Sequence, residues 1–248
     1  MLWALLFSII FSAGEQTALL SPNSKKYIKG NIEAKDTRAD AMSILKNYLK
    51  TDHKAFVRHT KTRAKELKLQ YADRSVGNDD LMKHYRSFEV ELAALQLKAI
   101  HGREDILKLI NEEEWIEILK QIDGEILKWD DMEAKTRQRF SDEASEVQDI
   151  ILAYVDSSAG RDSLLVTFRQ FVQQREILFQ VSHNSTYHSH AILRNKESTK
   201  GQVATVYKVI NDQRNQTFQS YLDLREALIR NTDEESWKAV YKKAARLY

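Results

Sequence analysis

Three histidines lie within eight residues of this chain, at His183, His188 and His190. Imidazole nitrogens are common ligands of zinc, copper and nickel, so this spacing raises the hypothesis of a metal site in residues 183–190. On one continuous helix His183 and His190 would share a face, because seven residues make about two turns, while His188 would point elsewhere. A loop, or a further ligand from another helix, would be needed to gather all three. The simpler alternative is a polar helix surface, and the sequence favours it.

Basic side chains recur at helical spacing in residues 54–68. Steps of four and three residues place them on one face of an α-helix, where they could bind an anionic polymer or an anionic lipid surface. They are Lys54, Arg58, Lys61, Lys65 and Lys68. Phe56 and Tyr71 are too few aromatic residues for stacking on nucleic-acid bases, and the whole chain has a net charge of only +2, so no specific nucleic-acid signal is present.

The charges of the chain are divided between two segments. From Lys46 to Arg74, nine Lys and Arg residues stand against three acidic residues, a net charge of +6. From Glu104 to Asp149, fifteen acidic residues stand against six basic ones, a net charge of −9. Clustered like charges repel, and an opposite cluster beside them relieves that repulsion. The sequence therefore favours an internal explanation, in which the basic helix docks beside the acidic one, over an exposed docking face.

Catalytic signatures are missing from the sequence. It contains no His-Glu-x-x-His zinc helix, no Gly-x-Ser-x-Gly elbow and no phosphate-binding glycine-rich loop ending in Gly-Lys. No histidine has a glutamate three residues before it, which excludes the Glu-x-x-His motif of di-iron bundles. Cysteine is absent, so disulfides, thiolate metal sites and cysteine nucleophiles are excluded. We therefore expect a non-enzymatic protein without a cofactor.

The elements that must position these side chains are helices. One proline and seven glycines in 248 residues leave helix formation almost uninterrupted. The longest amphipathic pattern runs from Glu112 to Tyr154, and as one helix it would be about 65 Å long and would need partners along its length. We assign to its buried side Leu119, Ile122, Ile126, Trp129, Phe140, Val147, Ile150 and Tyr154.

Shorter helical patterns precede the long one. A first helix starts near Asp36 and is expected to end at a break at Thr51 and Asp52, before a second helix over residues 54–72. A heptad seam then runs from Leu81 to Ala99. We expect it to end at Gly102, as at a glycine C-cap, and a short helix over residues 104–110 to follow.

Two more helical patterns follow the long one, and Thr232 with Glu235 forms a capping box before the last helix. No strand alternation stands out. The sequence thus predicts an all-α fold, an elongated antiparallel bundle of three or four long helices with shorter helices packed at an end.

The N-terminal residues 1–14 are typical of an export signal. Met1 to Phe11 is almost wholly apolar, and small residues follow at Ser12 and Gly14, as in a cleavage site. This apolar run is shorter than the roughly 20 residues that span a bilayer, so no transmembrane helix is expected in the mature chain. We therefore expect a periplasmic or secreted protein.

Residues 15–35, with the one proline at Pro22, are assigned to a linker or N-terminal arm, and residues 36–248 to a single helical-bundle domain. The first functional hypothesis is an exported, non-enzymatic scaffold that binds another protein or associates with the cell envelope. The alternatives are a protein that binds a polyanion, such as an envelope polymer, or a membrane surface through residues 54–68, and a metal-binding protein using residues 183–190.

Overall fold

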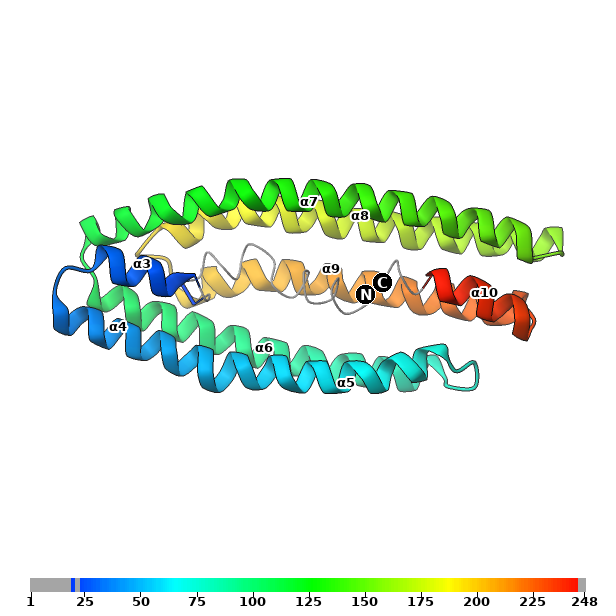
Figure 1. Ribbon diagram of the computed structural model, residues 1–248, viewed down its shortest axis with the longest axis horizontal. Helices are drawn as coiled ribbons and strands as arrows, with labels where there is room; N and C mark the ends of the chain where they lie inside the picture. Colours follow the sequence, from blue (N-terminus) through cyan, green and yellow to red (C-terminus); the bar gives the residue numbers. More distant parts are fainter. Residues whose placement is uncertain (1–18, 21–22, 245–248) are drawn as a thin grey trace.

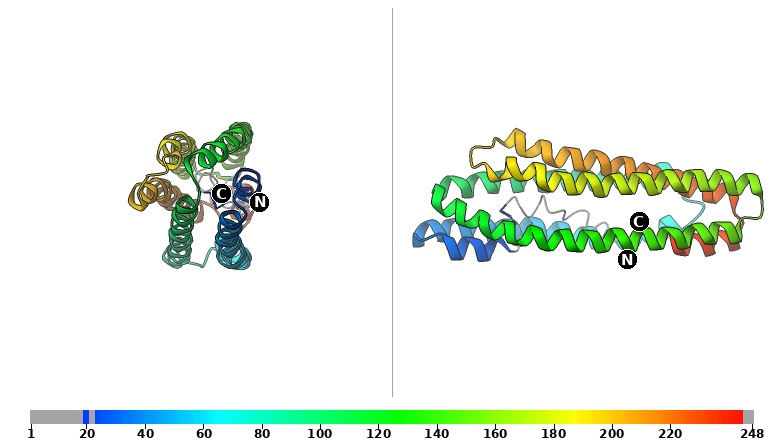
Figure 2. Two further views of the ribbon diagram at one scale, coloured as in Figure 1. Left: turned by 90° about the vertical axis from the view of Figure 1, so that its left-hand side faces the viewer. Right: turned by 90° about the horizontal axis from the view of Figure 1, so that it is seen from above.

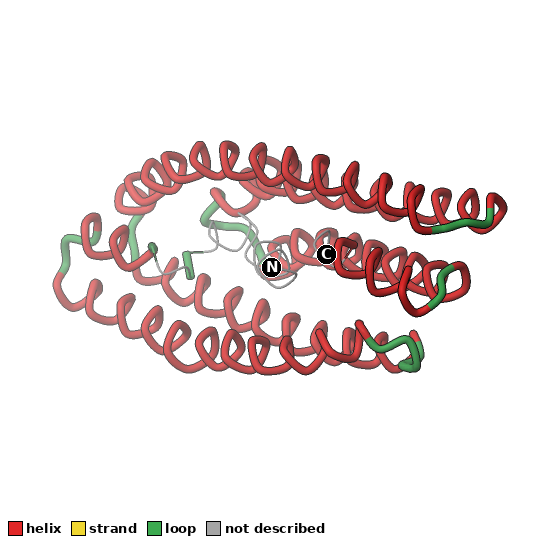
Figure 3. Tube along the Cα trace, turned by 45° about the vertical axis from the view of Figure 1, so that its right-hand side comes forward, coloured by secondary structure: helices red, strands yellow, loops and turns green. Residues whose placement is uncertain are grey.

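Helices account for nearly all of the structure. The computed structural model describes residues 19–20 and 23–244, with the side chains of residues 64–65, 125–130, 132 and 185–190 left outside that description. This part of the chain contains helices, turns and no strand, so the predicted all-α class is confirmed. Figure 3 shows the short loops that join the helices.

The helices follow one another with short connections (Figure 1). In chain order they are α3 (Ser24–Asn31), α4 (Lys35–Asn47), the π-helical segment η1 (Tyr48–His53), α5 (Lys54–Ala72), α6 (Asn78–Leu109), α7 (Glu112–Tyr154), α8 (Ser158–Arg194), α9 (Lys200–Asn231) and α10 (Glu234–Ala244).

The long helices lie side by side along the longest axis of the molecule, as the end-on view in Figure 2 shows. Helices α6, α7, α8 and α9 each exceed thirty residues. The segment α4–η1–α5 forms a further continuous rod beside α6. The predicted count of three or four long helices is therefore not confirmed.

Helix α7 has the bounds that the sequence predicts, Glu112–Tyr154. A capping box starts it: the Glu114 backbone N–H donates to Asn111 Oδ1 at 2.8 Å, and the Asn111 N–H donates to Glu114 Oε2 at 3.0 Å. Ile122, Phe140 and Val147 are buried as expected, and Leu119 and Ile150 are half-buried. The side chains of Ile126 and Trp129 are outside the described residues. Tyr154 is 46% exposed, so that assignment is wrong, and the fully buried Ile151 takes its place in the core.

The predicted helix end at Gly102 is wrong, because α6 continues through this residue to Leu109. A Cβ atom built on Gly102 would lie only 2.8 Å from Leu20 Cδ1. The glycine therefore makes room for a close approach of the N-terminal segment, not for a turn. Gly124 in α7 differs, because nothing lies within 4 Å of the position of its missing Cβ.

The N-terminal arm contributes to the core. Within residues 15–35, where the sequence suggests a linker, α3 packs against α4 and α7. Tyr27 and Ile28 are buried with Leu19, Ile32 and Trp115 in one hydrophobic cluster. Apolar residues spaced over this short stretch thus close one end of the molecule.

Side chains of α9 and α10 donate hydrogen bonds to the turn between α5 and α6. Arg225, 2% exposed, donates from Nε to the Tyr71 carbonyl at 3.1 Å, from Nη2 to the Asp73 carbonyl at 2.5 Å and from Nη1 to Asn78 Oδ1 at 3.0 Å. The Trp237 indole N–H donates to the Ala72 carbonyl at 3.1 Å. These donors satisfy carbonyls at the end of α5 that have no partner within their own helix.

The predicted Thr232 cap is wrong by one residue. The Ser236 N–H donates to Asp233 Oδ1 at 2.7 Å, and the Thr232 hydroxyl donates back to the Leu228 carbonyl. No helix in the described part of the chain is long and apolar enough to cross a membrane.

Candidate functional site

Six basic residues line the outer side of the α4–η1–α5 rod, and we call them the basic face. All six are exposed: Lys46, Lys50, Lys54, Arg58, Lys61 and Lys68. Lys65 lies at the matching position of α5, but its side chain is outside the described residues. At 1.5 Å per residue, the basic face extends over about 33 Å.

The predicted break at Thr51 and Asp52 is wrong, because η1 joins α4 to α5 without interruption. This continuity adds Lys46 and Lys50 to the basic residues that the sequence singled out. A four-residue step overshoots one α-helical turn by about 40°. A π-helical turn holds more residues, so the same step falls short of a full turn there. The insertion of η1 therefore offsets the drift and helps keep the two halves of the basic face in line.

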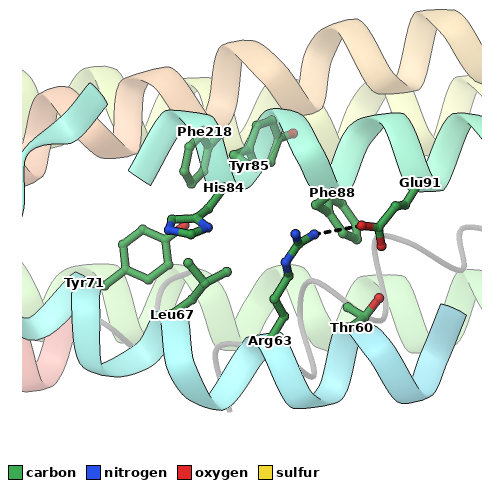
Figure 4. A pocket seen from close by; sticks show the side chains of 9 residues that line it. All are labelled: Thr60, Arg63, Leu67, Tyr71, His84, Tyr85, Phe88, Glu91 and Phe218. Carbon is green, nitrogen blue, oxygen red and sulfur yellow. Dashed lines mark hydrogen bonds and ion pairs between the residues drawn. The ribbon is translucent and has the colours of Figure 1, made fainter. Parts of the chain in front are cut away.

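The opposite side of α5 packs against α6 and α9. Figure 4 shows Leu67 and Tyr71 of α5 facing Tyr85 and Phe88 of α6 and Phe218 of α9. All five are buried, and the Tyr85 and Phe218 rings stack with their centroids 4.0 Å apart. This apolar seam orients α5 so that the basic face points away from the core.

A polar bridge reinforces the seam. Arg63 of α5 donates from Nη1 to Glu91 Oε1 at 2.9 Å (Figure 4). It also donates from Nη2 to Ser87 Oγ at 3.1 Å. Glu91 Oε2 also lies 2.9 Å from His59 Nδ1. The cation Arg63 on this side of α5 is therefore joined to α6.

The seam encloses a cavity of only about 20 Å³. Thr60 lines it with its side chain 2% exposed, and the Thr60 hydroxyl oxygen has no hydrogen-bond partner in the protein. A space of this size holds about one water molecule, which could satisfy the hydroxyl. The cavity is too small for an organic substrate, and its position supports a structural role in the α5–α6 contact.

The internal explanation requires the basic face to lie beside the acidic segment, residues 104–149. The structure does not place it there. The main packing partners of α7 are α3, α8 and α10, whereas α5 packs on α6 and η1. Asp123 of α7 lies 2.7 Å from Arg194 of α8, and Glu146 lies 2.9 Å from Lys243 of α10. In Figure 1, α7 and α5 run along opposite long edges of the molecule.

The histidine stretch lies inside the continuous helix α8. His183 Nδ1 is 3.3 Å from Glu133 Oε2 of α7, an ion pair when the imidazole is protonated. The side chains of His188 and His190 are outside the described residues. Among the described residues, no group of three His, Asp or Glu side chains could hold a metal ion. The metal-binding hypothesis therefore stays a prediction.

An open cleft of about 520 Å³ lies between α6 and the start of α9. Arg103, 2% exposed, donates from Nη2 to the carbonyls of Leu193 and Asn195 at 3.0 and 3.1 Å, and burial lowers its pKa. Lys196 donates to the Ile110 carbonyl at 2.5 Å. These cations donate to carbonyls at the C-terminal ends of α8 and α6 that have no partner within their helices. This structural role explains the cations without a bound ligand.

Two of the six residues of the basic face, Lys46 and Lys50, were missed by sequence reasoning. The signal was present, since both precede Lys54 at four-residue steps and neither proline nor glycine separates them from α5. Comparison of the chain with protein-family models, curated proteins and solved structures gives no match.

Proposed function

We propose that this protein is a non-enzymatic, elongated antiparallel helical scaffold that associates with the cell envelope by docking its basic face onto an anionic surface. One observation carries the proposal. The six residues of the basic face are exposed along one side of a continuous rod whose other side is held by apolar packing.

The chemistry of the basic face favours an anionic polymer or anionic lipid headgroups over a protein partner. Protein interfaces are built around buried aromatic anchors and are poor in lysine. The large apolar side chain that α5 exposes is Leu69, at 75%. A row of cations without anchors binds by releasing counterions, so its affinity falls as salt rises.

The fold also supports this function by preorganising the charges. Exposed lysines on a flexible segment would lose chain entropy on binding, whereas here the backbone is already helical. Arg63, Arg225 and Trp237 hold α5 to α6, α9 and α10. The charges therefore meet a partner as a straight row.

The test is retention on immobilised heparin, a soluble polyanion, beside binding to vesicles with and without anionic phosphatidylglycerol. The test variant reverses three charges of the basic face, Lys54→Glu, Arg58→Glu and Lys68→Glu. The control variant changes the net charge of the protein by the same amount but reverses three exposed lysines outside the basic face, Lys120→Glu, Lys208→Glu and Lys238→Glu. Each of these lysines pairs with an acidic residue of its own helix.

We expect the test variant to bind more weakly. The slope of its log K against log salt should be shallower by about 2–3, at roughly 0.7–0.9 for each of the three charges. The control variant should keep most of its affinity. Binding to heparin alone identifies a polymer, and binding to anionic vesicles alone identifies a membrane. Equal losses of affinity in the test and control variants would refute a specific role of the basic face. If the unmodified protein bound neither heparin nor anionic vesicles at low salt, a protein partner would become the favoured hypothesis.

The export part of the proposal is separate. It is supported by the apolar residues 1–11 and the small residues Ser12 and Gly14, which lie outside the described structure. We expect the protein purified from its native cells to begin at Glu15 and to fractionate with the periplasm or medium. N-terminal sequencing checks this, and an intact Met1 in the cytosolic fraction would contradict it.

A further inference from the structure

Helix α6 has an apolar stripe on its outer side. Val90 is 71% and Leu97 is 51% exposed, and Ala93 and Ala94 between them are exposed as well. The steps of three, four and seven residues place all four on one helix face. This stripe differs from the buried seam of α6, whose members are Leu81, Tyr85, Phe88, Leu92, Leu95 and Ala99.

Charged residues continue the stripe in both directions on the same face. Towards the N-terminus lie Arg86, Lys83, Asp80 and Asp79, and towards the C-terminus lie Glu104, Asp105 and Lys108. Lys83 is 78%, Lys108 65%, Asp80 64% and Asp105 55% exposed at the side chain. Read outward from the two alanines, the order is base then acid on one side, and acid then base on the other.

We propose that a second copy of this chain docks on the stripe, with the two α6 helices antiparallel about a twofold axis at Ala93 and Ala94. In that arrangement Val90 of each copy packs on Leu97 of the other. The small side chains on the axis let the two helices approach closely. An isologous contact of this kind needs a self-complementary surface, and the stripe has one.

Charge selects the antiparallel orientation. Positions at equal or nearly equal distance from the axis carry opposite charges. Lys83 of one copy lies opposite Glu104 and the adjacent Asp105 of the other, and Asp79, with the adjacent Asp80, lies opposite Lys108. A parallel pair would place each of these residues against its own kind, and like charges at close range are unfavourable. The pairs within one chain, such as Lys83 with Asp80 at 3.2 Å, are exposed and free to rearrange.

The contact has a short apolar centre, so the dimer is expected to be weak, with a Kd of about 1–100 µM. Sedimentation equilibrium of the full chain over a range of concentrations measures it. Leu97→Asp places a charge at the centre and should raise the Kd at least about tenfold. The control is Val166→Asp on α8, where the residue is 52% exposed and lies off the stripe.

A charge swap tests the orientation. Lys83→Glu and Asp105→Lys should each weaken the dimer, and the two changes in the same chain should restore it, because opposite charges then face each other again. Far-ultraviolet circular dichroism checks that each variant stays helical. A chain that remains monomeric throughout the concentration range, a dimer insensitive to Leu97→Asp, or a swap that weakens binding further would each overturn the proposal.

Discussion

Replacement of Arg225 by methionine should destabilise the protein strongly, although Arg225 lies far from the basic face along the chain. Its guanidinium makes three hydrogen bonds, to the carbonyls of Tyr71 and Asp73 and to Asn78 Oδ1. Methionine keeps an unbranched apolar side chain beside Trp237 and removes all three donors. The Tyr71 carbonyl would then be buried without a partner, and the Asp73 carbonyl would lose its donor.

The size of the effect follows from two opposing contributions. A hydrogen bond from a charged donor contributes about 1.5–3 kcal/mol, and the contributions of three bonds from one group do not add fully. Against them stands the cost of removing the guanidinium from water, and burial indeed lowers the pKa of Arg225. We expect a net loss of about 3 kcal/mol, which corresponds to a fall in Tm of about 6–12 °C for a chain of this size.

Urea unfolding followed by circular dichroism measures the change for Arg225→Met. The matched control is Arg230→Met, one turn and a residue further along α9, where the side chain is 71% exposed and pairs with Glu226. The control should change stability by less than about 0.5 kcal/mol. If Arg225→Met were as stable as the control, the desolvation cost of Arg225 would equal the stabilisation from its hydrogen bonds. The attachment of α5 to the rest of the bundle would then have to be assigned to the apolar seam alone.

Three further predictions concern the core, one helix and pH. Phe88→Ala should cost about 2–5 kcal/mol in urea unfolding, because Phe88 is 8% exposed and packs on Phe56. Gly124→Ala should raise stability by about 0.5–1 kcal/mol, since no neighbour opposes the added Cβ, and a loss would reveal one. Burial raises the pKa of Tyr85 and Tyr221, so native protein keeps protons that the unfolded chain loses above about pH 10. Stability should therefore be constant from neutral pH to about pH 9 and fall above pH 10, and a flat profile at pH 11 would contradict the assignment.

Local chemistry determined much of the fold. The bounds of α7 follow from a 3.6-residue apolar period and from a capping pair, Asn111 and Glu114, three residues apart. The buried residues of α6 and α9 were likewise predictable from heptad spacing, as Leu81, Phe88 and Tyr221 show. Such features depend on neighbours within one or two turns, which the sequence displays directly.

Only the tertiary structure decided which helices are neighbours. Gly102 could end a helix or admit a close neighbour, and Leu20, distant in the chain, decides between the two. Opposite net charges suggested that α5 lies beside α7, yet Leu67 and Tyr71 pack against α6 and α9. Exposed charges attract each other weakly in water, whereas a buried aromatic seam removes a large apolar area from it, so packing overrides the charge pattern. The basic face is exposed for that reason. The spacing within α5 places its cations on one side of the helix, but it does not specify whether another helix covers that side.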